Sequence, residues 1–155
     1  MNGEKNNLEF AFAVMSKRDK HLVGSTAFLS VVQLHKRVEI GSTWYVPSQQ
    51  GNAINPECKF LLLRHAFEDW GAVRVELRTD QNNLHSQRAI EKLGARLEGI
   101  MRNNGIRPDG SFRNALLYSI IPTEWPRIKS KLQDRIASFR ESSDHGYHKS
   151  DARRS

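Results

Sequence analysis

The chain contains 155 residues, of which 38% are hydrophobic, and it carries a formal net charge of +7. That length suits one domain with its own core, and the apolar content excludes a chain that is disordered throughout. No apolar run approaches the roughly 20 residues of a membrane-spanning helix, and the polar first seven residues lack the apolar centre of a signal peptide. A cytoplasmic protein without a membrane partner is therefore expected.

The excess of positive charge is spread unevenly along the chain. Residues 1–122 contain 16 basic and 12 acidic side chains, whereas residues 123–155 contain eight and five. A mild positive field suits a polyanionic partner. A basic domain associated with nucleic acid or the ribosome stays open as an alternative, although no helix-turn-helix, zinc-finger or aromatic stacking motif supports it.

The first part of the chain predicts three strands. Phe10–Met15 and Leu22–Val32 are rich in strand-forming residues and flank a short charged turn, which indicates a hairpin. A further strand is expected over Arg37–Val46, ended by Pro47, which cannot donate a hydrogen bond to a sheet.

A helix is predicted over Asn55–Gly71. Asn55 is a suitable N-cap, Pro56 then occupies the first helical position, and Gly71 is a typical terminator. Apolar residues recur at helical spacing and form one stripe, made of Phe60, Leu63, Phe67 and Trp70 and widened by Leu61, Leu62 and Ala66.

The second half of the chain predicts a strand, a helix and two more strands. Val73–Thr79 alternates apolar and charged residues, and Leu84–Leu93 is a helix preceded by a polar loop and closed by Gly94. Strands are expected over Ala95–Arg102 and Arg113–Ile121. The order predicts an α+β domain with a mixed sheet flanked by helices: a core over residues 1–126, a C-terminal helix over 127–140 and a disordered tail over 141–155.

The connection between the third strand and the first helix is a candidate anion site. Backbone N–H groups at a helix start lack internal partners and, with the helix dipole, suit a pyrophosphate. Gly51 lets a ligand approach the backbone closely, although a glycine before a helix is more often only a turn. The candidate binding residues are Gln50, Gly51, Asn52, Ala53, Ile54 and Asn55.

A second motif opens the second helix. Asn83-Leu84-His85-Ser86 begins it, and Lys92-Leu93-Gly94 ends it. In this order and spacing, the two motifs together resemble those of the GNAT acetyltransferases, in which Asn-x-x-Ser opens a helix that ends in Lys-x-Gly. The resemblance implies acetyl-CoA as the acetyl donor, with Asn83 and Ser86 near its pantetheine and phosphate arm. Both residues also favour helix caps, so a purely structural role stays open.

Three further segments are similar to one branch of that family, the RimJ/RimL-type ribosomal-protein alanine acetyltransferases. They are Glu39–Gly41, Asn55–Glu57 and Ser119–Pro126. The resemblance implies a sheet whose strands over 37–46 and 73–79 splay apart to admit acetyl-CoA, with backbone groups near Tyr45 and Val46 holding the pantetheine arm. It also implies an amine-bearing acceptor, which is a protein N-terminus or a small molecule, and a homodimer is plausible.

The chain departs from the family pattern at three places. Ser48 stands where the phosphate loop of the family has Gln or Arg, and Ile90 stands where many members have a proton-donating tyrosine. The strand and two helices that precede the hairpin in the family have no counterpart before Phe10. A catalytically inactive, coenzyme-binding or regulatory module is therefore an alternative to an N-acetyltransferase.

Glu39 is the candidate catalytic base, because related enzymes use a carboxylate on this strand to deprotonate the amine. A strand glutamate that pairs with a surface arginine is an equally good interpretation. No metal site is expected: Cys58 is the only cysteine, and the histidines show no metal-ligand spacing.

Overall fold

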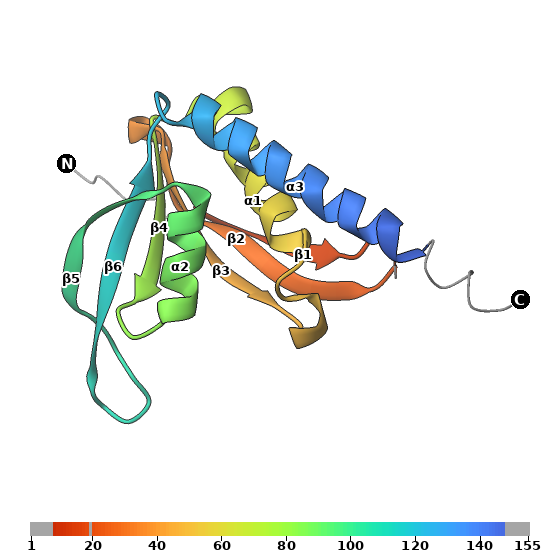
Figure 1. The fold of residues 1–155 in the computed structure, drawn as a ribbon. Coiled ribbons are helices and arrows are strands. Elements are labelled where there is room, and N and C mark those ends of the chain that lie inside the picture. Colours follow the sequence, from red (N-terminus) through yellow and green to blue (C-terminus); the bar gives the residue numbers. More distant parts are fainter. Residues whose placement is uncertain (1–7, 19, 148–155) are drawn as a thin grey trace, which may run out of the picture.

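The computed structural model describes the backbone of residues 8–18 and 20–147 and the side chains up to residue 141. Its strands form one sheet in the order β1-β2-β3-β4-β6-β5 (Figure 1). The strands are β1 (Leu8–Met15), β2 (Leu22–Val32), β3 (Arg37–Tyr45), β4 (Arg74–Asp80), β5 (Arg96–Ile106) and β6 (Phe112–Ile120). The helical segments are η1 (Gln33–His35), η2 (Pro47–Gln49), α1 (Ile54–Arg64), the π-helical turn η3 (His65–Asp69), α2 (Leu84–Leu93) and α3 (Trp125–Tyr147).

The three α-helices cover the same face of the sheet (Figure 1). Alternate strand residues point to that face, such as Ile40 in β3 and Val75 in β4, because successive side chains of a strand point to opposite sides. They are buried in one apolar cluster with Leu63 of α1, Leu93 of α2 and Ile128 of α3. The β3–β4 pair is parallel and the other four pairs are antiparallel, so the predicted α+β domain with a mixed sheet is confirmed.

The two central strands separate along their length. β3 and β4 are paired only at Arg37↔Arg74, Val38↔Val75 and Glu39↔Glu76. Beyond these pairs β3 continues to Tyr45 and β4 to Asp80, so their carboxyl ends leave a gap in the sheet, as the resemblance implied.

A β-bulge lies in the separated half of β3. The pairing with β2 passes from Ala27↔Gly41 to Ser25↔Trp44, which leaves one extra residue in β3, and Ser42 has a positive φ of 47°. The extra residue directs the Thr43 and Tyr45 side chains to the helical face, where they contact α1.

Helix α1 begins earlier than predicted, and Asn55 as its N-cap was wrong. Ala53 occupies the N-cap position, and the Asn52 side chain accepts a hydrogen bond from the Ile54 N–H at 3.0 Å. Asn55 lies inside the helix, and its side-chain oxygen instead accepts from the Tyr45 hydroxyl at 3.3 Å. The start of α1 therefore depends on the contacts of Asn52 in the loop and of Tyr45 in β3, and the apolar spacing of the helix does not reveal either contact. The turn at the other end is as predicted, with Gly71 at φ +68°.

Helix α3 is longer than the expected C-terminal helix. It begins at Trp125 and runs to Tyr147, so residues 141–147, which were expected in a disordered tail, continue the helix. Residues 148–155 of that tail lie outside the described residues. Ile128 and Leu132 place α3 in the common core. Within the described residues, no helix has both the length and the apolar character that crossing a bilayer requires.

Candidate functional site

The gap between β3 and β4 opens into a cleft of ≈ 1030 Å³. Its walls come from the bulged half of β3, the end of β4, the start of α1, one side of α2 and the middle of α3. Of the predicted binding residues, seven line this cleft: Tyr45, Gln50, Gly51, Asn52, Asn55, Asn83 and Ser86. Two motifs that are about 30 residues apart in the chain therefore meet at one site.

The loop before α1 presents free backbone donors. The Gln50 N–H bonds to the Pro47 carbonyl at 3.2 Å, and the helix ladder begins with the Glu57 N–H on the Ala53 carbonyl at 2.9 Å. Between them, the N–H groups of Gly51 and Asn52 have no hydrogen-bond partner within the part of the chain that the structure describes. Gly51 has a φ of +77°, a conformation that suits glycine, and no neighbouring atom crowds it. Such donors at a helix start form a ready anion site.

Three of the predicted binding residues do not line the cleft. They are Val46, Ala53 and Ile54. The Val46 N–H donates to the Val23 carbonyl at 2.9 Å, and its carbonyl accepts from the Gln49 N–H at 2.9 Å. The Ile54 N–H is taken by Asn52. The backbone N–H groups of Val46 and Ile54 are thus occupied by the fold itself.

Asn83 caps α2 as its sequence pattern indicated. Its side-chain oxygen accepts a hydrogen bond from the Ser86 N–H at 3.0 Å, and Gly94 ends the helix at φ +99°. Ser86 also lines the cleft. Ile90 also lines the cleft and is buried, so the position at which many relatives have a tyrosine carries no exchangeable proton here.

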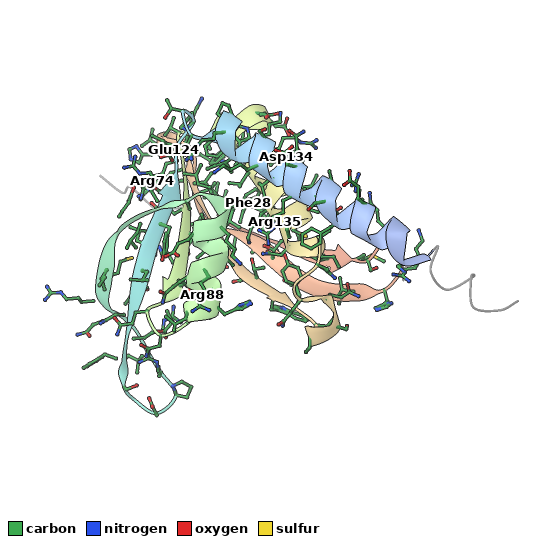
Figure 2. All side chains as sticks on the ribbon, viewed as in Figure 1. Phe28, Arg74, Arg88, Glu124, Asp134 and Arg135 are labelled. Atoms are coloured by element: carbon green, nitrogen blue, oxygen red, sulfur yellow. The ribbon has the colours of Figure 1, made fainter. Side chains whose placement is uncertain are left out.

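Several basic side chains line the cleft. Arg88 on α2 and Arg135 on α3, both labelled in Figure 2, line it from two different helices. His85, Lys92 and Arg113 also line it. This local positive charge suits a ligand that carries several phosphates.

Glu39 lies beside the cleft but does not line it. It points to the sheet face that no described helix covers, where its carboxylate is 3.4 Å from Arg78. Burial raises its pKa above the ordinary value, while Arg78 acts in the opposite direction and Glu76 adds to the rise. Its carboxylate is 3.7 Å from the position that a Cβ on Gly41 would take, and Gly41 does line the cleft. The arginine pairing is thus present, and the catalytic role stays a prediction.

Lys59 is a cleft residue that the sequence pattern did not single out. It lies in the second turn of α1, exposes 9% of its surface, and donates a hydrogen bond to the Thr43 hydroxyl at 2.8 Å. Burial lowers its pKa to about 8, against a smaller opposing effect of Cys58. The signal was available, because Lys59, Leu63 and Ala66 follow the i, i+4, i+7 spacing of a buried helix face. Among the described residues, no group of three or more His, Cys, Asp or Glu side chains could hold a metal ion.

Comparison with known proteins identifies the family. A family model described as "Acetyltransferase (GNAT) domain" matches residues 1–96. The Bacillus subtilis protein YjcK, whose name assigns it as an N-acetyltransferase, is 26% identical over 113 residues, which are 73% of this chain and 62% of YjcK. YdaF of the same organism, whose name places it among ribosomal N-acetyltransferases, is 27% identical over 107 residues, or 69% of this chain and 57% of YdaF.

Solved structures give the same assignment. A GCN5-related N-acetyltransferase from Brucella melitensis superimposes with a TM-score of 0.79 at 29% identity, covering 82% of this chain and 57% of that protein. The chain thus spans about three fifths of the length of these relatives. The matched segment includes the β3–α1 loop and the helix that Asn83 opens, which are the two motifs that meet at the cleft. The chain belongs to the GNAT acetyltransferase family.

Proposed function

We propose that this chain is an acyltransferase that transfers the acetyl group of acetyl-CoA to a primary amine. The separation of β3 from β4, which opens directly onto the free donors of the β3–α1 loop, carries this proposal. One end of the cleft suits phosphates, and the other end is a slot between two strands with unpaired edges. A long ligand with a phosphate end and an amide-rich arm fits both.

The phosphate end of the coenzyme is assigned to the loop. The N–H groups of Gly51 and Asn52, which have no partner among the described residues, would bind the pyrophosphate, and the basic residues of α2 and α3 would add long-range attraction. Ser48 stands where the family pattern has Gln or Arg, so the loop relies on its backbone donors.

The arm of the coenzyme is assigned to the free edge of β3. Successive N–H groups of a strand point to opposite edges, and that of Val46 points to β2, so that of Tyr45 points to the gap. An amide of the pantetheine arm can pair with Tyr45 as an added strand would. Tyr45 thus takes the role that was expected of Tyr45 and Val46 together.

Bound acetyl-CoA supplies the reactive thioester, and the protein positions and polarises it. Glu39 is the proposed base for the amine, acting directly or through a water beside Gly41. Its raised pKa suits a group that must accept a proton near neutral pH. Replacement of Glu39 by Gln should lower kcat with little effect on coenzyme binding.

The name of YdaF supports the finer assignment to the RimJ/RimL branch, with a protein N-terminus as the acceptor; a small amine is the other class of acceptor. A cytoplasmic location and a homodimer complete the proposal. The coenzyme assignment is independent of these points and is the first to test.

The first test is stabilisation by acetyl-CoA. Selective binding to the folded state raises the free energy of unfolding by about 2.7 kcal/mol when the ligand is at 100 times its Kd. Asn52→Asp keeps the oxygen that accepts from the Ile54 N–H, loses the amide that donates to Gln49 Oε1 at 2.7 Å, and adds a negative charge beside the free donors of the loop. We expect the stability of this variant without ligand to be within about 1 kcal/mol of the parent value, because a negative charge suits a helix start and offsets the lost hydrogen bond. We also expect it to bind acetyl-CoA about tenfold more weakly or worse, from repulsion of roughly 1–2 kcal/mol.

Gln33→Glu is the matched control, because it adds the same charge at an exposed position of η1, before the opposite end of β3. Thermal unfolding with and without acetyl-CoA reports binding, and release of free thiol with a panel of amines and N-terminal peptides reports turnover. No stabilisation of the parent at millimolar acetyl-CoA would contradict the proposal. Stabilisation without turnover on any amine would favour the inactive coenzyme-binding module instead.

A further inference from the structure

Lys59 is held in the cleft by a short chain of hydroxyl groups. Its ammonium donates to the Thr43 hydroxyl at 2.8 Å, and that hydroxyl lies 2.8 Å from the hydroxyl of Thr26 on β2. The bulge at Ser42 is what turns Thr43 to this side of the sheet. The position of the ammonium is therefore built by three elements, α1, β2 and β3.

This ammonium is buried without an acidic partner. Lysine side chains are almost never fully buried unless they are paired, because desolvation of the charge is costly. Among the described residues, none of the ion pairs includes Lys59. An ammonium has three donors, and only the bond to Thr43 uses one of them. A ligand in the cleft can receive the others.

The depth of Lys59 indicates which part of the ligand it meets. Thr43 lies three residues inside Val46, or about 10 Å at the rise of an extended strand. Along β3, Thr43 therefore lies between the last β3–β4 pair, Glu39↔Glu76, and the phosphate loop that follows Val46. Given the proposed function, on which this inference depends, a coenzyme with its pyrophosphate on the loop and its arm along β3 carries its sulfur toward Lys59.

Three other residues that line the cleft, Ile90, Tyr45 and Arg78, are poor proton donors. Ile90 has no exchangeable proton. The Tyr45 hydroxyl donates to Asn55, and burial raises its pKa further above the ordinary value. Arg78 pairs with Glu39 and Glu76 and, as a guanidinium, does not release a proton at neutral pH. Lys59 has a pKa of about 8, near the pH at which a proton donor is most effective.

We propose that Lys59 is the catalytic residue that protonates the departing thiolate of coenzyme A. As the amine nitrogen bonds to the acetyl carbon, the carbon–sulfur bond breaks and its electron pair stays on sulfur. The Nζ of Lys59 gives one proton to that sulfur and becomes a neutral amine. The amine nitrogen loses its own proton to the base, and Lys59 regains a proton from solvent. The products are the acetylated amine and free coenzyme A thiol.

The first experiment measures the thiol pKa of bound coenzyme A and needs no acceptor. Ultraviolet absorbance follows the thiolate during a pH titration of coenzyme A on the parent, on Lys59→Met and on the control Lys131→Met, which changes an exposed residue of α3. We expect the parent to hold the thiol pKa about one unit or more below that in Lys59→Met, a tenfold difference in thiolate, because a positive charge in contact favours the anion. Lys131→Met should match the parent.

The comparison between variants also controls for the other ionisable groups of the cleft and for Cys58, because each of them is present in every variant. The groups that titrate are Cys58 on α1, Tyr45 on β3, Asp80 on β4, and His85 and Lys92 on α2. The permanently charged groups are Arg78 on β4, Arg88 on α2, Arg113 on β6 and Arg135 on α3. All of them are retained in every variant.

The second experiment separates proton transfer from charge alone. We expect Lys59→Met to lower kcat by about 100-fold or more while the KM for acetyl-CoA stays within a few-fold of the parent value. Lys59→Arg should keep the thiol pKa low but should not restore kcat, because a guanidinium keeps its proton. Full activity of Lys59→Arg would overturn the role as proton donor.

Two failures are distinguishable. If coenzyme A binds the parent and Lys59→Met with the same thiol pKa, the inference is overturned and the proposed function stands. If coenzyme A does not bind the parent at all, the proposed function is overturned and this inference falls with it.

Discussion

At the scale of the residue, Lys59 links folding to pH. Burial lowers its pKa from 10.5 to about 8, so between these values the unfolded chain binds more protons than the folded one. The free energy of unfolding therefore rises with pH in that window. A Lys59 pKa lowered from 10.5 to about 8 corresponds to at most about 3 kcal/mol of unfolding free energy.

Lys59→Met should remove this dependence. We expect the parent to gain stability relative to Lys59→Met as pH rises from 7.5 to 10, and the variant to be the more stable protein at pH 7, because it buries no charge. Urea denaturation at the two pH values measures both differences, and Lys131→Met provides the baseline for the other titrating groups. A parent and a Lys59→Met variant with parallel pH profiles would contradict the burial of a charged Lys59.

At the scale of the element, β4 carries a network of charges on the face that no described helix covers. Arg74 donates to Glu98 of β5 through its Nη1 and Nη2 and to Glu76 through its Nε, and Arg78 donates to Glu76 at 3.0 Å. Burial alone would raise the pKa of Glu76, but the hydrogen bonds from the two arginines outweigh it, and the net pKa is lowered. The network fixes β4 to β5 across β6 on that face.

Arg74→Met should destabilise the fold because it leaves buried Glu76 with fewer partners. Breaking a buried ion pair costs about 3–5 kcal/mol, and the partial exposure of Glu98 reduces this to roughly 2 kcal/mol. Urea unfolding at pH 7 gives the difference. Part of the loss should disappear in Arg74→Met with Glu98→Gln, because the second change removes an unpaired charge. A single variant within 0.5 kcal/mol of the parent would show that the network contributes little.

Local patterns predicted the elements better than their ends and contacts. The helices around Leu63 and Leu93 follow from apolar spacing, a signal that lies within a few residues. The start of α1 depends on Asn52 and on the Tyr45–Asn55 bond, which joins residues ten apart. The burial of Lys59 was not predicted because only apolar residues were used to define the buried face of the helix. Which N–H groups of the loop are free could not be predicted, because strand pairing at Val46, the turn after Pro47 and the Asn52 side chain together decide it.

At the scale of the whole molecule, α3 belongs to the same core as the matched family segment. Trp125 stacks on Phe67 at 5.6 Å between ring centroids, and its indole N–H donates to Glu68 at 2.8 Å. Further along the helix, Leu132 and Arg135 reach the cleft wall. The position of α3 therefore affects both stability and the proposed coenzyme site.

Trp125→Ala should lower the free energy of unfolding by about 3–5 kcal/mol, the usual cost of removing a buried aromatic side chain. Because α3 carries part of the cleft wall, the variant should also lose affinity for acetyl-CoA. Leu34→Ala is the control: Leu34 is 87% exposed, and the change should cost less than about 0.5 kcal/mol. Urea unfolding measures the loss of stability, and titration with acetyl-CoA measures the loss of affinity. A variant that keeps its stability but binds acetyl-CoA weakly would show that the two effects are independent.

The short pairing between β3 and β4 has a consequence for cooperativity. The backbone ladder divides the sheet into two antiparallel halves, β1-β2-β3 and β4-β6-β5, which share only the register pairs from Arg37↔Arg74 to Glu39↔Glu76. Such halves are natural units for sub-global opening, and amide exchange along the shared pairs would report it. A ligand in the gap would bridge the parts of β3 and β4 that are not paired with each other. We then expect its main effect on amide hydrogen exchange to be that the two halves open together.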